Sequence, residues 1–196
     1  MNLGLTGDIG SGKSTVLRIF ASLGWNTFSA DEAVHRLLSS DPDTIQEVSA
    51  RFDSGILNPD GSVNRKSLGA LVFGDPSALE ALEAILHPRV RADWKEFLRH
   101  HEGELNVVEI PLLFEKRLEN DFMFCVTVWA HSDVKIRRLE QRGMDLAAIK
   151  RRINAQLPQN TKATLSHFVL LNNGSITFLE DQIRLLTDRL RPKGCS

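Results

Sequence analysis

Short apolar runs alternate along the chain with longer segments in which apolar residues recur every three or four positions. The runs are NLGLT (2–6), WNTFSA (25–30), LNVVEIPLLFE (105–115), FMFCVTVWA (122–130) and HFVLLN (167–172). The third and fourth runs are rich in β-branched and aromatic residues, as buried strands are. Alternating strands and helices are typical of βαβ units. The pattern therefore predicts an α/β fold built on a parallel sheet, with flanking helices at about 13–23 and 175–190.

The middle of the chain departs from this alternation. From residue 41 to about residue 103 the pattern is mostly helical, interrupted by a tight turn at the sequence PDG. We interpret this part as a helical lobe inserted into the core. A second insertion, 132–156, carries two basic helical patterns separated by Gly143 and is interpreted as a small lid. The core that remains comprises 1–40, 104–131 and 157–196, and the whole chain is expected to form one domain.

Composition narrows the possible partners. The chain has 196 residues, and its 24 Lys and Arg against 25 Asp and Glu give a formal net charge of −1. No global field draws such a protein to nucleic acid or to an anionic membrane, so a bound anion must be held locally. Two cysteines, Cys125 and Cys195, supply neither a disulfide framework nor metal-ligand spacing. With no apolar run of about 20 residues and no signal sequence, we expect a reduced cytoplasmic protein.

The turn after the first run carries the strongest chemical signal. It reads GDIGSGKS from Gly7 to Ser14, and it lies between an apolar strand and an amphipathic helix. This is the phosphate-binding pattern G-x-x-x-x-G-K-[ST], in which glycines let successive backbone N–H groups point at phosphate oxygens. Lys13 is then expected to reach the β- and γ-phosphates, and the Ser14 hydroxyl to ligate Mg²⁺. The alternative is a glycine-rich turn with a chance lysine.

A phosphate loop is shared by switches, motors and kinases, so other residues must separate these classes. The chain has neither a D-x-x-G nor an N-K-x-D segment of GTPases, and Glu109 is expected inside the third run rather than at its end. Asp31 does follow a strand, the second one, which is where a kinase for a small acceptor needs a group to accept or position a hydroxyl proton. Asp31 could instead be a plain helix N-cap or a Mg²⁺ ligand through water, and a cap could also be catalytic.

Several segments together resemble one family. They are GLTGDIGSGKS, SADEAVHRLL, PDGSVNRKSLGALVF, LEAILHPRV, VVEIPLLFE and VTVWAHSDVKIRRLEQR. In order and spacing they look like dephospho-coenzyme A kinase, a resemblance that spans most of the chain. It implies transfer of the ATP γ-phosphoryl group to the 3′-hydroxyl of dephospho-coenzyme A with Mg²⁺. It also implies a P-loop kinase fold with a five-stranded parallel sheet, a helical acceptor-binding lobe and a small helical lid.

The resemblance carries site residues onto this sequence. Asp31 becomes the hydroxyl base or positioning group, and Asn172 is matched to a loop that meets the adenine. The ATP-binding set is Gly10, Ser11, Gly12, Lys13, Ser14 and Thr15. The acceptor set, beside Asp31, is His87, Pro88, Val90, Pro111, Leu112, Leu113 and Phe114. Ser29 departs from the family, which usually has an acid at this position, so either metal affinity is lower in this chain or Ser29 holds a water in place of the acid.

Plainer interpretations remain open for some of these residues. His87 could be a capping or core histidine, and Asn172 could belong to an ordinary turn. The basic residues of 132–156 could form a solvated helix face. We nevertheless expect Arg138 and Arg142, which are spaced i, i+4, to stabilise charge on the transferred phosphoryl group, with Lys13 as the third cation.

Two other functions compete with this interpretation. One is a small-molecule kinase for a different alcohol, and the other is a non-catalytic ATP-dependent switch. Nucleic-acid binding is not expected, because charges are balanced and no aromatic stacking platform accompanies them. We expect a monomer, with self-association left open.

Overall fold

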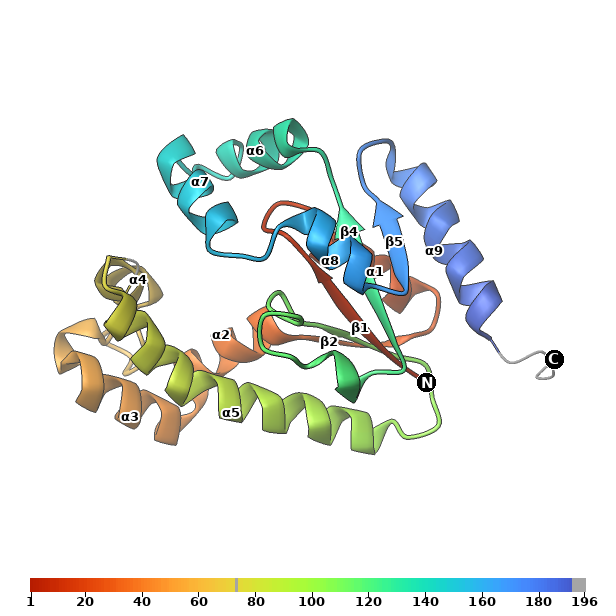
Figure 1. Cartoon of the computed structure of the whole chain (residues 1–196). Helices are drawn as coiled ribbons and strands as arrows, with labels where there is room; N and C mark the ends of the chain where they lie inside the picture. Colours follow the sequence, from red (N-terminus) through yellow and green to blue (C-terminus); the bar gives the residue numbers. More distant parts are fainter. Residues whose placement is uncertain (73, 192–196) are drawn as a thin grey trace. The chain divides into compact units, whose positions relative to one another are not determined.

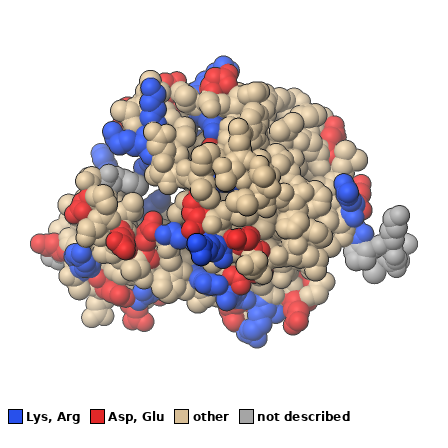
Figure 2. All heavy atoms as spheres, viewed as in Figure 1, with Lys and Arg blue, Asp and Glu red and all other residues tan. Residues whose placement is uncertain are grey.

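The computed structural model describes residues 1–72 and 74–191. The expected thiol at Cys195 lies outside the described residues. The chain divides into two compact units, one formed by 1–29 and 101–196 and the other by 30–100, and each is described by itself. Charged side chains of both signs occur on the face in Figure 2, consistent with the net charge of −1.

The first unit is built on a sheet whose five strands are all parallel (Figure 1). The strands are β1 (Asn2–Gly7), β2 (Asn26–Ser29), β3 (Asn106–Glu109), β4 (Phe124–Trp129) and β5 (Phe168–Leu171), and their order is β2-β3-β1-β4-β5. The predicted five-stranded parallel sheet is confirmed. In the register of β1, Leu5 lies opposite Glu109 of β3 and Val126 of β4. The carboxyl ends of the strands therefore meet at one edge, where open α/β sheets bind their ligands.

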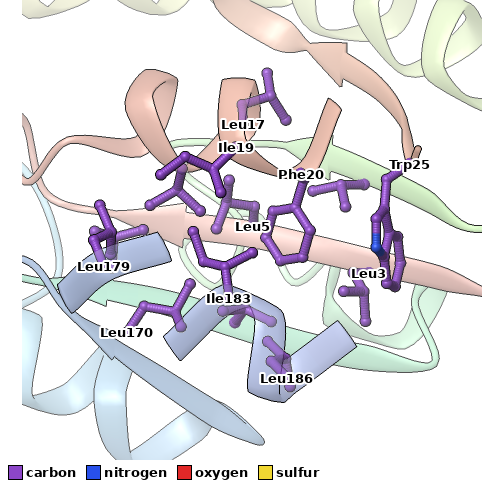
Figure 3. Close-up of a cluster of buried hydrophobic side chains, with 14 of the residues drawn as sticks. Leu3, Leu5, Leu17, Ile19, Phe20, Trp25, Leu170, Leu179, Ile183 and Leu186 are labelled. Carbon is purple, nitrogen blue, oxygen red and sulfur yellow. The ribbon is translucent and has the colours of Figure 1, made fainter. Parts of the chain in front are cut away.

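The two faces of the sheet are covered differently because successive side chains point to opposite sides. Leu3 and Leu5 face α1 (Lys13–Ser22) and α9 (Ile176–Leu190) in the main apolar core, drawn in Figure 3. There Trp25 meets Phe20 edge to face, with ring centroids 5.2 Å apart. Thr6 and Thr127 point to the other face, where α8 (Gln159–Leu165) packs on β1 and β4. The expected packing of the last helix on the sheet is thus confirmed.

The second unit is helical, as the pattern of the middle segment predicts. It contains α2 (Ala30–Ser40), α3 (Pro42–Phe52), a 3₁₀ turn (Ser54–Ile56), α4 (Arg65–Val72) and α5 (Pro76–His100). The PDG turn lies between Leu57 and Val63, which form an isolated antiparallel bridge. The unit begins at Ala30, before residue 41, because β2 runs directly into α2. Its longest helix, α5, passes through Pro88 without ending.

The remaining elements of the first unit follow β3 and β4. A 3₁₀ turn (Glu119–Asp121) precedes β4, and α6 (Ser132–Glu140) and α7 (Leu146–Asn154) follow it. Gly143 lies between these two helices with a φ of 81°, as the sequence pattern indicates. Among the residues that the structure describes, no helix is both long enough and apolar enough to span a bilayer.

Candidate active site

The glycine-rich loop connects β1 to α1 at the carboxyl edge of the sheet. Gly10 and Gly12 have φ values of 79° and 99°, a region that residues with a side chain rarely adopt. The N–H of Ser11 donates to the carbonyl of Asp8 over 3.1 Å, which closes the turn. Helix α1 starts directly after Gly12, so its first-turn N–H groups point out of the helix end. A glycine turn at a helix N-terminus is a binding site for phosphate.

Lys13 folds back over this loop. Its ammonium donates to the carbonyl of Gly7 over 3.0 Å and to that of Asp8 over 3.2 Å. The side chain of Lys13 is buried, whereas Ser14 beside it is exposed on the first turn of α1. The loop thus presents a cation and a hydroxyl from adjacent residues, which is what binding of a metal–polyphosphate requires.

Arg138 and Asn172 form a hydrogen-bonded group that contacts the loop. Arg138 donates to the backbone carbonyls of Gly10 and Ser11 over 3.4 and 3.3 Å, and to the carbonyl and side-chain oxygens of Asn172 over 3.1 and 3.2 Å. Asn172 in turn donates from Nδ2 to the Ser11 carbonyl over 2.7 Å. Burial, and then the neighbouring charge of Arg142, lower the pKa of Arg138. The structure therefore brings together Arg138, Asn172 and the loop, which sequence reasoning had placed separately.

A buried ion pair also reaches the loop, and sequence reasoning missed it. Lys135 of α6 donates from Nζ to Asp8 Oδ2 over 2.6 Å and to Gln159 Oε1 over 3.0 Å. The N–H of Ile9 donates to Gln156 Oε1 over 3.0 Å. The only signal in the sequence is an acid inside the phosphate loop, since a loop that binds phosphate is a costly place for an uncompensated negative charge.

Glu109 ends β3, which corrects the expectation that it lies inside that run. The strand stops there, and the chain turns away at Pro111, whose carbonyl accepts from Thr6 Oγ1 over 3.1 Å. The Glu109 side chain is buried and accepts a hydrogen bond from Ser29 Oγ over 2.9 Å. Ser29 therefore contacts a carboxylate, where the sequence had suggested that it could hold a water.

The oxygen donors at this edge suit Mg²⁺. The ion accepts one or two protein oxygens and keeps several waters, so it needs no dense cluster of ligands. Ser14 offers a hydroxyl at the start of α1, and Glu109 offers a carboxylate on the strand next to β1. Within residues 1–72 and 74–191, no group of three or more His, Cys, Asp or Glu is arranged to hold a metal. The site thus fits a metal brought in with a polyphosphate.

The segment after β3 is held by a second buried lysine. Lys162 of α8 donates to Glu115 Oε1 over 2.8 Å and to the carbonyl of Pro111 over 3.0 Å. Leu113 and Phe114 are buried, whereas Pro111 and Leu112 are half-buried. Of the acceptor residues in this segment, Pro111 and Leu112 are the two with surface to offer a ligand.

The remaining candidates belong to the helical unit. Asp31 is exposed and lies in the first turn of α2, after the first helical residue, so it is not the N-cap that the plain interpretation suggests. A carboxylate in a first turn is stabilised by the helix dipole. His87 lies inside α5, with its Nδ1 4.0 Å from Glu83 Oε2. Pro88 next to it is exposed, and Val90 is buried.

The basic residues of the predicted lid are mostly exposed. Arg142 follows α6, and Lys150, Arg151 and Arg152 belong to α7. Figure 2 shows blue side chains gathered at the upper left, where Figure 1 draws α7. These cations lie in the same unit as the phosphate loop. An exposed basic surface of this kind is expected of a lid that approaches a bound polyanion.

Comparison with known proteins gives one consistent result. A family model described as dephospho-CoA kinase matches residues 1–177. The chain is 37% identical over 187 residues to the dephospho-CoA kinase of Corynebacterium jeikeium, covering 93% of this chain and 96% of that protein. It is 40% identical over 185 residues to the enzyme of the same name from Brucella melitensis, covering 92% and 90%.

Solved structures show the same likeness. The protein TT1252 from Thermus thermophilus matches with a TM-score of 0.82 at 34% identity, covering 98% of both chains. Dephospho-CoA kinase from Campylobacter jejuni matches with a TM-score of 0.72 at 26% identity, covering 96% of both. Shikimate kinase from Acinetobacter baumannii has a TM-score of 0.53 at 14% identity over 97% and 95% of the two chains, which shows the shared fold alone.

Proposed function

The chain belongs to the dephospho-CoA kinase family, and from that premise we propose the part that each of its site residues plays in the reaction of the family. It is an ATP-dependent kinase that transfers the γ-phosphoryl group of ATP to the 3′-hydroxyl of dephospho-CoA, giving CoA and ADP in the last step of CoA biosynthesis. The observation that carries this conclusion is the family match over residues 1–177, which includes the whole of the helical unit and most of the other unit.

The phosphates of ATP bind at the loop between β1 and α1. The backbone N–H groups of Gly10 to Thr15 donate to the phosphate oxygens, and the ammonium of Lys13 turns from the loop carbonyls to the β- and γ-phosphates. Ser14 and Glu109 would hold the Mg²⁺ that accompanies ATP. When bound, the ion neutralises charge on the phosphates and fixes their orientation.

Asp31 accepts the proton of the acceptor hydroxyl, or holds this hydroxyl in line with the γ-phosphate. Two observations support this role. Asp31 follows β2, which ends at the carboxyl edge of the sheet with Ser29 bonded to Glu109. Its carboxylate is also exposed in the first turn of α2, so a hydroxyl group of an acceptor can reach it.

Arg138 and Arg142 take different parts in the reaction. Arg138 is bonded to the loop carbonyls and to Asn172, so it fixes the loop and its surroundings. Asn172 acts with it on the side of the loop where the base of ATP would lie. Arg142 is exposed, and with the cations of α7 it can approach the phosphoryl group when the lid closes.

Two segments carry the residues proposed to contact the acceptor. One is His87, Pro88 and Val90 of α5, and the other is Pro111, Leu112, Leu113 and Phe114 after β3. The exposed Pro88 and the half-buried Pro111 and Leu112 make the direct contacts, whereas Val90, Leu113 and Phe114 are buried beneath the surface of their own units and support these contacts. The protein works as a cytoplasmic monomer on these small molecules.

The test is a coupled assay of ADP release with ATP, Mg²⁺ and dephospho-CoA. For Asp31→Asn we expect the rate to fall by roughly two to four orders of magnitude, as loss of a general base does. Asp43→Asn is the matched control, because Asp43 is an exposed acid in the first turn of the next helix, α3, and it should leave the rate unchanged. Equal rates for the natural protein and Asp31→Asn would exclude the role of Asp31.

The same assay without acceptor separates a kinase from a switch. A kinase must exclude water as a competing nucleophile, so ATP turnover alone should be slow and should rise steeply when dephospho-CoA is added. A panel of other alcohols should give much lower rates. Equal ATP turnover with and without dephospho-CoA would contradict the proposed acceptor.

A further inference from the structure

The phosphate loop of this chain contains an acid. Asp8 follows the first glycine of the loop, and its side chain is only 4% exposed. A carboxylate so near a bound polyphosphate repels it, and burial weakens the screening by water. A loop with this residue therefore binds nucleotide well only if the charge is compensated nearby.

Lys135 provides that compensation. Its ammonium donates to Asp8 Oδ2 over 2.6 Å, and its side chain is 2% exposed. Asp8 Oδ1 is buried and has no hydrogen-bond partner among the described residues, so Lys135 is the group that balances this carboxylate. The nearby cations Lys13 and Arg138 donate instead to loop carbonyls, those of Gly7 and Asp8 for Lys13 and those of Gly10 and Ser11 for Arg138.

The pair also joins the loop to the segment that contains the lid. A Cβ built at Gly10 would lie 3.0 Å from the carbonyl oxygen of Lys135, so α6 packs directly on the loop. Gln159, which follows the lid, accepts from Lys135, and Gln156 accepts from the N–H of Ile9. Both ends of the lid segment are therefore attached to the phosphate loop, and one of these attachments is ionic.

We propose that Lys135 is a positioning residue for phosphoryl transfer, which neutralises Asp8 inside the phosphate loop and so sets the affinity of the loop for nucleotide. This inference deepens the proposed function and rests on the loop's binding of ATP. It adds to the site a charge pair, Asp8 and Lys135, that takes no part in making or breaking bonds. Its effect is electrostatic, so it depends on the charge of Asp8 and on the charge of the ligand.

A buried lysine can also be purely structural, and the chain offers a matched control for that case. Lys162 is fully buried in the same unit and pairs with Glu115 over 2.8 Å. It is attached to the segment after β3 rather than to the phosphate loop. Replacing either lysine removes one partner of a buried ion pair, which is destabilising in both cases. A change in nucleotide affinity is expected for Lys135 alone.

The experiment compares the full-length natural protein with Lys135→Met, Asp8→Asn, the double variant and Lys162→Met. Dissociation constants for ATP and for ADP are measured by calorimetry, and thermal unfolding is followed in parallel. We expect Lys135→Met to weaken ATP binding on the order of tenfold and ADP binding less, because ATP carries more charge. The double variant should recover most of the lost affinity, and Lys162→Met should keep the natural ATP affinity.

Two results would overturn the proposal. One is a double variant that binds ATP as weakly as Lys135→Met, and the other is an equal loss of ATP affinity in Lys162→Met. If Lys135→Met does not fold, Asp8→Asn decides the matter, because removing the negative charge should leave ATP binding as tight as in the natural protein or tighter. A natural protein that binds ATP but does not phosphorylate dephospho-CoA would contradict the proposed function without affecting this inference.

Discussion

In the phosphate loop, both the backbone conformation and the packing at Gly12 require a glycine. Its φ is 99°, and a Cβ built there would lie 2.1 Å from Nδ2 of Asn172. Alanine at this position would strain the backbone and push Asn172 away from Ser11 and Arg138. We therefore expect Gly12→Ala to weaken ATP binding by at least an order of magnitude, measured by calorimetry.

Gly24 provides the control for this variant. It also has a positive φ, 84°, but a Cβ there would meet nothing within 4 Å. Gly24→Ala should cost about 1 kcal/mol of stability through backbone strain alone. Its ATP affinity should equal that of the natural protein. If both variants lost ATP affinity to the same extent, the loss would come from general destabilisation and not from the loop.

For single residues, the sequence predicts those site features that neighbouring residues encode. The glycines, Lys13 and Ser14 follow from eight adjacent residues, because the loop conformation is encoded within them. The pair of Asp8 and Lys135 joins residues 127 positions apart, and no short pattern contains both. Contacts that depend on how α6 packs on the loop become visible only in the fold.

The start of α3 illustrates how one side chain fixes an element. Asp41 is the N-cap, and its carboxylate accepts from the N–H and the hydroxyl of Thr44. The bond from the Thr44 hydroxyl, and then the one from its N–H, lower the pKa of Asp41. Asp41→Ala should therefore destabilise the protein by about 1 kcal/mol at pH 7, measured by chemical denaturation.

The pH dependence of this effect has a definite sign. A carboxyl group whose pKa is lower in the folded protein stabilises the fold above its unfolded pKa of about 3.9, and this contribution is lost as the pH falls through the folded value. The difference between the natural protein and Asp41→Ala should shrink below about pH 4. Asp41→Asn keeps a capping oxygen without a titrating charge, so it should be nearly as stable as the natural protein at pH 7. A difference that persists unchanged at pH 3 would contradict the role of the ionised cap.

At the element scale, the type of each segment was predictable and its length was not. The run 105–115 is mostly apolar over its whole length, yet β3 covers only Asn106–Glu109. Pro111 ends the strand, because it has no N–H and because its carbonyl bonds to Thr6 and Lys162. In α5, by contrast, a proline does not end the element. Leu86 and Val90 are buried on either side of Pro88, and the helix continues through it.

For the molecule as a whole, a net charge of −1 conceals an uneven distribution. Lys150, Arg151 and Arg152 are exposed together on α7, in the unit that also contains the phosphate loop. The parallel sheet and the helical unit follow from hydrophobic periodicity, because periodicity reports which side of each element is buried. The response of residues 132–156 to ligands is a property of the whole molecule, so the periodicity of α7 alone cannot predict it.

The lid interpretation makes a prediction that hydrogen exchange can test. Because α7 has one fully buried residue, Ile149, and a largely exposed surface, its amides should open readily in the protein without ligand. A non-hydrolysable ATP analogue with dephospho-CoA should bring its cations to the phosphates and slow exchange within residues 146–154 by about tenfold or more. Helix α9 already packs its apolar face on the sheet, so its exchange should change little. Equal slowing in α7 and α9 would indicate general stabilisation by ligand, and unchanged exchange in α7 would show that 132–156 is not a lid.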